Sequence, residues 1–308
     1  MNKNLRIIYM GTPEFAVAGL ELLVENGWNI VGVITAPDKP KGRGQKLIPS
    51  PVKEAALKLD LNILQPTNLK SPEFQEELRS LKADLQIVVA FRMLPESVWD
   101  MPRLGTFNLH ASLLPNYRGA APINWAIING DKETGVTTFF LKHEIDTGSI
   151  IYQEKVPILE EDNLGTLYEK LMTIGSKLVL KTVEDIAEDT VQALPQDEFK
   201  ALHHAPKIFK ETGEIEWSKS AESIHNLVRG LSPYPAAWTR FDDKNCKIYK
   251  TRYFPTQKTS KAIGELETDN KSFIKVQTGE GVLEILELQL EGKKRMKMDD
   301  LLRGFKFN

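Results

Sequence analysis

Leu5-Arg-Ile-Ile-Tyr-Met10 is the first of several short apolar runs in the N-terminal half of the chain. Similar runs follow at Asn29–Thr35, Leu61–Leu64 and Leu85–Ala90, with amphipathic segments between them. Strands that are apolar on both faces and are connected by helices form parallel sheets covered on both sides. The pattern therefore predicts a Rossmann-like open α/β domain over residues 1–189, which includes a long helix at Asn163–Glu188.

The C-terminal third has a different pattern. Residues 190–208 contain two prolines and little periodicity, so we expect a linker there. After a helical pattern at Ala221–Gly230 come short alternating runs. They lie at Trp238–Asp242, Cys246–Tyr253, Ser272–Thr278 and Gly281–Leu290. Residues 209–308 are therefore predicted to form a small β-barrel domain.

The composition limits the possible functions. The 308 residues carry 40 Lys and Arg against 42 Asp and Glu, so no global charge attracts nucleic acid. The single cysteine, Cys246, excludes an internal disulfide and offers no thiolate cluster for a metal. Because we find neither a signal-peptide pattern nor an apolar run long enough to span a bilayer, we expect a cytoplasmic protein without a membrane partner.

Three side chains at the ends of two apolar stretches suggest a catalytic site. Asn108 and His110 end one stretch, and Asp146 follows the next in Asp146-Thr-Gly148. An amide can stabilise an oxyanion, an imidazole can move a proton near neutral pH, and a carboxylate can orient the imidazole. The alternatives are a structural histidine at a strand end and an Asp-Thr-Gly turn. Gly11-Thr-Pro13 lacks the Gly-x-Gly-x-x-Gly pattern, so a nicotinamide cofactor is not expected.

The residues around His110 carry a resemblance. The stretch His110-Ala-Ser-Leu-Leu-Pro115-Asn-Tyr-Arg118-Gly-Ala-Ala-Pro122-Ile-Asn124 resembles the signature of enzymes that transfer a formyl group from 10-formyltetrahydrofolate. Further matches to those family members that formylate methionine on initiator tRNA lie at Met10–Phe15, Lys41–Lys46, Pro49–Lys53, Ile215–Trp217, Pro233–Pro235 and Gly292–Lys294. The resemblance implies an OB-like C-terminal domain, direct formyl transfer catalysed by Asn108, His110 and Asp146, and no metal.

The resemblance also implies a folate site. It assigns Ser112, Leu113, Leu114 and Pro115 to the pterin and its linker; the alternative is a proline-ended loop. The loop Ala90–Pro95 departs from the family pattern, which has a glycine and one more residue before Leu-Pro. Phe91 and Met93 are candidates for folate contacts, but the departure from the family pattern leaves it open whether they make them.

Basic residues are candidates for binding the acceptor tRNA. Lys39–Lys46 holds four cations and two glycines, and we expect a loop there that could contact phosphates and an unpaired base. In the family, an arginine corresponding to Arg43 reads the unpaired first position of the acceptor stem, and Lys41 and Lys46 flank it here. Residues 244–308 carry 14 Lys and Arg against 9 Asp and Glu. The further tRNA candidates are Lys207, Lys293 and Lys294, although solvated surface lysines are the alternative.

Other functions stay open at this point. The same chemistry could formylate a small amine such as a nucleotide-linked amino sugar, or release formate by hydrolysis. A module that binds RNA without catalysis is a third alternative. We expect a monomeric enzyme that uses 10-formyltetrahydrofolate and initiator Met-tRNA.

Overall fold

The computed structural model describes residues 3–41, 45–197, 200, 203–241 and 244–307. The chain forms two compact units, which are described separately below. The first unit comprises residues 1–118, 135–156 and 168–204, and the second comprises residues 119–134, 157–167 and 205–308. Two short strands, β8 (Arg118–Gly119) and β11 (His204–Ala205), lie where the chain passes from one unit to the other.

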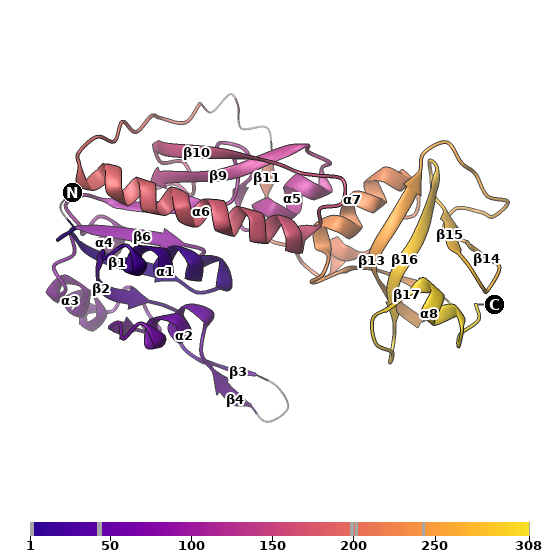
Figure 1. The fold of residues 1–308 in the computed structure, drawn as a ribbon, viewed down its shortest axis with the longest axis horizontal. Coiled ribbons are helices and arrows are strands. Elements are labelled where there is room, and N and C mark those ends of the chain that lie inside the picture. The colour runs from indigo at the N-terminus through magenta and orange to yellow at the C-terminus, as the bar shows by residue number, and fades with distance from the viewer. Residues whose placement is uncertain (1–2, 42–44, 198–199, 201–202, 242–243, 308) are drawn as a thin grey trace. The chain divides into compact units, whose positions relative to one another are not determined.

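The first unit is built on one sheet. In the described part of the chain, seven strands pair in the order β10-β9-β7-β6-β1-β2-β5. Figure 1 labels β10, β9, β6, β1 and β2 of this sheet. Their bounds are β1 Arg6–Gly11, β2 Asn29–Ile34, β5 Ile63–Leu64, β6 Leu85–Val89, β7 Thr106–His110, β9 Glu133–Phe140 and β10 Ile150–Pro157. The strands from β5 to β7 are parallel, whereas β9 runs antiparallel to β7. The predicted Rossmann-like α/β fold is confirmed, with a mixed edge at β9.

The helices of this unit begin where the local sequence favours helix starts. Their bounds are α1 Val17–Glu25, after a 3₁₀ turn at Glu14–Ala16, α2 Pro51–Lys58, α3 Pro72–Ser80, α4 Glu96–Trp99 and α6 Leu164–Ala187. The Ser50 and Ser71 hydroxyls accept hydrogen bonds from backbone amides of the first turns of α2 and α3. Each cap is followed by proline, which suits the first helical position. The helix predicted at Asn163–Glu188 is α6.

The long helix α6 packs on the strand that carries the candidate site. A Cβ atom added to Gly175 of α6 would lie 2.8 Å from Cδ2 of Leu109 on β7, so the Leu109 side chain would have to shift if this position carried a side chain. The Thr182 hydroxyl of α6 also lies 2.9 Å from that of Thr138 on β9. Because α6 covers the Leu109 face, the neighbouring residues Asn108 and His110 point to the opposite face of the sheet.

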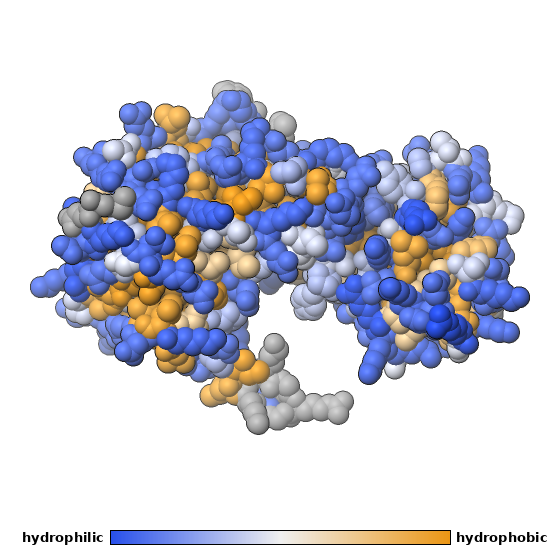
Figure 2. Space-filling view, viewed as in Figure 1, coloured by the Kyte–Doolittle hydropathy of each residue, from blue (hydrophilic) through white to orange (hydrophobic). Residues whose placement is uncertain are grey.

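The basic segment expected to be a loop contains paired backbone. Strands β3 (Lys39–Lys41) and β4 (Lys46–Ile48) form an antiparallel hairpin. The side chains of Leu47 and Ile48 on β4 are exposed, and Figure 2 shows apolar surface where Figure 1 places this hairpin. Backbone pairing, rather than an apolar pattern, defines these strands, which is why the sequence did not indicate them.

The second unit contains an antiparallel sheet and three helices among its described residues. The strands are β12 Ala237–Phe241, β13 Lys244–Phe254, β14 Leu266–Thr268, β15 Ile274–Gln277, β16 Val282–Leu290 and β17 Met296–Lys297. The helices are α5 Pro122–Ile128, α7 Ala221–Leu231 and α8 Met298–Leu302, and a 3₁₀ turn lies at Glu211–Gly213. Their apolar side chains share one core, so the antiparallel half-barrel confirms the predicted fold class. Among the described residues, no helix has the length and apolarity needed to cross a bilayer.

His225 of α7 should make the stability of this unit depend on pH. Burial of the ring, and then the nearby Arg229 charge, lowers the pKa of His225 from 6.5 to about 4. Its Nδ1 lies 2.8 Å from the Thr251 hydroxyl. Because the unfolded chain binds this proton at a higher pH than the folded chain does, stability that is present above pH 6.5 is lost as the pH falls toward 4.

We therefore expect the wild-type protein to lose about 1–2 kcal/mol more unfolding free energy between pH 7 and pH 5 than His225→Gln loses. Urea denaturation of both proteins at the two pH values measures this difference. Equal losses would contradict the assignment.

Candidate active site

Strand β7 presents Asn108 and His110 on one face of the sheet, because residues two apart on a strand point the same way. Asn108 pairs with Val88 of β6 and with Phe139 of β9, so it lies in the interior of the sheet. His110 stands at the carboxyl end of β7, beside β6, and the strand order reverses between β1 and β6. Ligands of open α/β sheets bind beyond these strand ends.

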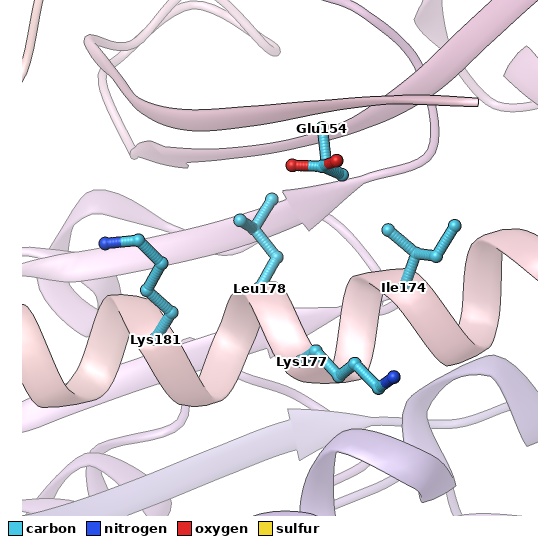
Figure 3. Close-up of a pocket in the computed structure, with 5 residues that line it drawn as sticks. All are labelled: Glu154, Ile174, Lys177, Leu178 and Lys181. Atoms are coloured by element: carbon cyan, nitrogen blue, oxygen red, sulfur yellow. The ribbon is translucent and has the colours of Figure 1, made fainter.

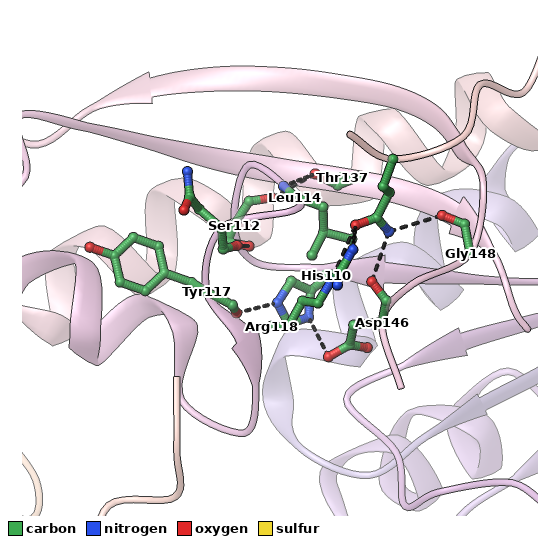
Figure 4. A network of polar contacts seen from close by, with 10 residues as sticks. His110, Ser112, Leu114, Tyr117, Arg118, Thr137, Asp146 and Gly148 are labelled. Carbon is green, nitrogen blue, oxygen red and sulfur yellow. Dashed lines mark hydrogen bonds and ion pairs between the residues drawn. The ribbon is translucent and has the colours of Figure 1, made fainter. Parts of the chain in front are cut away.

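The two ring nitrogens of His110 face different partners. Nε2 lies 2.8 Å from the carbonyl oxygen of Tyr117, and Nδ1 lies 3.9 Å from Oδ2 of Asp146. Figure 4 shows the ring between these two groups. Because a carbonyl oxygen only accepts hydrogen bonds, Nε2 must carry a hydrogen, which leaves Nδ1 as the nitrogen that gains or loses a proton. A proton on Nδ1 would face the Asp146 carboxylate.

A tight turn places the Asp146 carboxylate. Asp146 adopts a left-handed conformation with φ of 55°. A Cβ atom added to Gly148 would lie 1.5 Å from the Phe140 carbonyl oxygen, so the turn between β9 and β10 needs glycine there. The side chains of His110 and Asp146 are only 7% and 12% exposed, which strengthens an interaction between their charges. The structure therefore brings together the histidine and the aspartate that the sequence suggested.

The Asn108 side chain makes no hydrogen bond to another described residue. Its Oδ1 atom is buried without a hydrogen-bond partner. No hydrogen bond among the described residues occupies its NH₂ group. An amide NH₂ next to a proton-carrying imidazole could stabilise a developing oxyanion.

The segment after β7 is held by a polar network. The Thr137 hydroxyl donates to the Ser112 carbonyl at 2.6 Å and accepts from the Leu114 backbone amide at 3.2 Å. The Gln153 amide donates to the Leu114 carbonyl at 2.8 Å, and the Ser112 hydroxyl donates to the Asn116 carbonyl. The side chains of Ser112, Leu114 and Pro115 are buried, while Leu113 is partly buried. Part of this network is drawn in Figure 4.

The loop that departs from the family pattern is anchored at Arg92. Its guanidinium donates to the Pro66 and Thr67 carbonyls and lies 5.5 Å from the centre of the Phe91 ring. Phe91 packs against the core, whereas the Met93 side chain is 72% exposed. Of the two candidates here, Met93 is therefore the more accessible.

A pocket of about 300 Å³ lies elsewhere in the first unit, between β10 and α6 (Figure 3). Its lining residues are Glu154, Ile174, Lys177, Leu178 and Lys181. None of the residues suggested by the sequence lines it, so it adds nothing to the candidate site. The described residues contain no group of three or more His, Cys, Asp or Glu able to hold a metal ion.

The basic candidates fall into two groups. Arg43 lies outside the described residues, and the backbones of Lys41 and Lys46 face each other across the β3–β4 hairpin. In the second unit, Lys293 and Lys294 are exposed. Neither forms an ion pair with another described residue. Lys207 lies 5.6 Å from the centre of the Phe209 ring, and that ring is 58% exposed.

The sequence did not indicate the residues that hold the site together. Tyr117 acts through its backbone carbonyl, and Thr137 and Gln153 act through contacts across the sheet. Gln196 lies in the predicted linker, yet its amide donates to the Asp146 carbonyl. No local pattern marks such contacts, because each joins residues that are brought near only by the fold.

The class of protein is defined by two family matches. The formyl transferase model matches residues 3–183, and the model of the formyl transferase C-terminal domain matches residues 207–306. A chain with both regions, and with an Asn-x-His strand facing an aspartate, has the organisation expected of a formyl-transferring enzyme.

Curated relatives narrow this class. The methionyl-tRNA formyltransferase of Bacteroides fragilis is 56% identical over 310 residues, covering 98% of this chain and 96% of the relative. That of Phocaeicola vulgatus is 58% identical over 315 residues, covering 99% and 97%. The chain belongs to the methionyl-tRNA formyltransferase family, a group of folate-dependent formyl transferases.

Solved structures share the fold. An N-formyltransferase from Helicobacter canadensis, in complex with folinic acid and dTDP-3-aminofucose, aligns with a TM-score of 0.69 and 22% identity. The alignment covers 91% of this chain and 99% of that one. HypX from Aquifex aeolicus aligns with a TM-score of 0.66 and 17% identity over 99% of this chain and 49% of its own. At these identities the likeness supports the fold alone.

The turn that carries Asp146 offers a direct test of the site. We expect Gly148→Ala to lower kcat for formyl transfer by about 100-fold, because we expect Asp146 to act in catalysis and a displacement of about 1 Å costs about this much. Steady-state kinetics, with circular dichroism to confirm folding, measures the effect. Gly304→Ala is the matched control, since a Cβ atom there meets nothing within 4 Å. Unchanged kcat in Gly148→Ala would show that the turn does not place Asp146.

Proposed function

We propose that this protein transfers the formyl group of 10-formyltetrahydrofolate to the α-amino group of methionine carried by initiator tRNA. The arrangement of His110 between the Tyr117 carbonyl and the Asp146 carboxylate, with Asn108 on the same face, carries the proposal. Two observations support the proposal. The arrangement suits acyl transfer to an amine, and the chain belongs to this family.

The reaction needs no covalent enzyme intermediate, because the folate already carries an activated formyl group. The methionine nitrogen attacks the formyl carbon and forms the new C–N bond, while the carbonyl electrons move onto oxygen. Collapse of this species breaks the bond to N10 of the folate, which takes up a proton as the amine loses one. Holding both reactants in one complex supplies much of the acceleration.

Each residue of the trio has a distinct part in this scheme. The Asn108 NH₂ group donates a hydrogen bond to the oxyanion, and the positive charge of the protonated His110 ring stabilises it further. Asp146 stabilises the imidazolium by charge, since 3.9 Å is too long for a hydrogen bond. The Tyr117 carbonyl keeps Nε2 protonated and orients the ring. His110 can therefore exchange protons at Nδ1 without turning.

The folate side of the site is proposed to lie along the loop Phe91–Met93 and the segment Ser112–Pro115. Met93 supplies exposed apolar surface for the pterin, while Phe91 supports it from the core. Because most side chains of Ser112–Pro115 are buried, that segment would shape the folate wall while Leu113 contacts the ligand.

The acceptor side is proposed to use Arg43, with Lys41 and Lys46 of the β3–β4 hairpin, together with Lys207, Lys293 and Lys294. Lysines contact phosphates without reading sequence, whereas an arginine can also stack on or pair with an unpaired base. Arg295 is a weaker candidate, because its guanidinium forms two 2.8 Å hydrogen bonds with Glu287.

We further propose that the enzyme is a cytoplasmic monomer. The catalytic trio and the proposed folate loop all come from the first unit of one chain, so no second copy is needed to complete them. Sedimentation equilibrium with and without tRNA tests the oligomeric state.

The proposed function is tested by incubating the purified protein with 10-formyltetrahydrofolate and methionine-charged initiator tRNA. Charged elongator tRNA and a dTDP-amino sugar serve as competing acceptors. Formyl-methionine formed selectively on the initiator is the expected result. Formyl transfer to the sugar alone, or formate release without an acceptor, would overturn the proposal.

Substituting the trio should remove most of the activity. We expect Asn108→Ala, His110→Ala and Asp146→Ala each to lower kcat by about 100-fold or more, because each removes oxyanion stabilisation or proton transfer. Single-turnover formylation measures this loss, and circular dichroism checks that each variant is folded. Near-normal rates in all three variants would exclude the trio as the catalytic group.

The salt dependence of tRNA binding tests the second unit. We expect the double variant Lys293→Ala/Lys294→Ala to reduce the slope of log affinity against log salt by about 1–2, because each phosphate contact releases counterions. Fluorescence anisotropy over a salt series gives the slope. Lys219→Ala is the control, since Lys219 is paired with Glu216 at 3.0 Å in the same unit. An identical slope in the double variant would remove these lysines from the interface.

A further inference from the structure

Gln196 lies in the stretch between the two regions that the family models match, 3–183 and 207–306. Its Nε2 group donates to the Asp146 carbonyl at 2.7 Å and to the Gly148 carbonyl at 2.9 Å. Its Oε1 atom accepts from Nε of Arg118 at 3.1 Å and from Nη2 at 2.5 Å. A residue of the predicted linker is thus hydrogen-bonded to the turn that carries Asp146.

The chemistry of these contacts fits a primary amide. The two carbonyl oxygens need donors and the guanidinium needs an acceptor, and a glutamine side chain supplies both. A glutamate at this position would keep the bonds from Arg118 but would place negative charge against two carbonyl oxygens. The site therefore selects the amide rather than a side chain of similar size.

The turn needs this support because its backbone is strained. Asp146 adopts a φ of 55°, which is uncommon for residues other than glycine and persists only where the surrounding structure holds it. The hydrogen bonds of Gln196 bind the carbonyl of Asp146 and that of the residue two positions later. They hold the part of the turn from which the Asp146 carboxylate extends toward His110.

Residues of the same stretch also hold the other side of His110. The backbone amide of Tyr117, whose carbonyl accepts from His110 Nε2, donates to the His203 carbonyl at 2.7 Å. The Tyr117 and His203 rings stack with centroids 5.5 Å apart. Arg118 follows Tyr117 directly, so Gln196 connects the chain on the Nε2 side of the histidine to the turn on its Nδ1 side.

We propose that Gln196 is a positioning residue for formyl transfer, which sets the place of the Asp146 carboxylate relative to His110 by holding the Asp146–Gly148 turn against Arg118. The expected effect of Gln196 on kcat rests on the proposed function, because it assumes that the protein transfers a formyl group. It assigns a role in the active site to a segment that lies between the two family regions.

The test compares Gln196→Met and Gln196→Glu with the wild-type enzyme. Methionine has a similar length but forms none of the hydrogen bonds, and glutamate keeps only the acceptor. Leu194→Ala is the matched control in the same segment, because Leu194 bonds to Ile150 through its backbone and its side chain is 67% exposed. Each protein is assayed for kcat, for KM of both substrates, for thermal stability, and for hydrogen exchange in peptides covering residues 141–149.

In both Gln196 variants we expect kcat to fall by about 10- to 100-fold with KM values within about twofold, as for a misplaced catalytic group. Exchange in residues 141–149 should become faster, while Leu194→Ala should behave as wild type. A kcat within about twofold of wild type in both variants, a change confined to KM, or unchanged exchange would overturn the proposal. So would a loss of rate that matches the loss of folded protein, because that would indicate a structural role alone.

The two readouts separate this proposal from the proposed function. If the wild-type protein forms no formyl-methionine, the proposed function fails, and with it the role of Gln196 in that reaction. Faster exchange in the variants would then still show that Gln196 holds the turn. If the wild-type protein is active and the variants equal it, only the Gln196 proposal fails.

Discussion

The hydrogen bond from His110 Nε2 to the Tyr117 carbonyl is the interaction on which the candidate site depends. It fixes the orientation of the ring and keeps the hydrogen on Nε2, so that Nδ1 is left to face Asp146. The acceptor is a backbone atom seven residues further along the chain. The course of the segment after β7 therefore determines which ring nitrogen of His110 carries the hydrogen.

Close backbone approach gives the site its shape. Gly175 lets α6 pack onto Leu109, and this packing turns Asn108 and His110 to the other face of β7. Gly148 lets the turn after β9 pass against the Phe140 carbonyl, and this contact brings Asp146 to the same place. These two glycines thus help to bring together His110 and Asp146, which lie 36 residues apart in the sequence.

Much of the fold was predictable because its signals are local. The apolar runs at Leu5–Met10 and Leu85–Ala90 correspond to β1 and β6, and the periodicity of Asn163–Glu188 corresponds to α6. These patterns reflect burial along a single element. The β3–β4 hairpin and β10 were not identified, because backbone pairing with a neighbouring strand defines them and their sequences do not alternate clearly.

The sequence by itself determined which side chains could perform the chemistry, because Asn108 and His110 are two residues apart on a strand and share a face wherever that strand lies. It also carried the motifs that indicate the family. Only the tertiary structure decided which nitrogen of His110 meets Asp146, and that Gln196 and Tyr117 support the site. These contacts join segments that are distant along the chain, and their geometry depends on packing that no local pattern encodes.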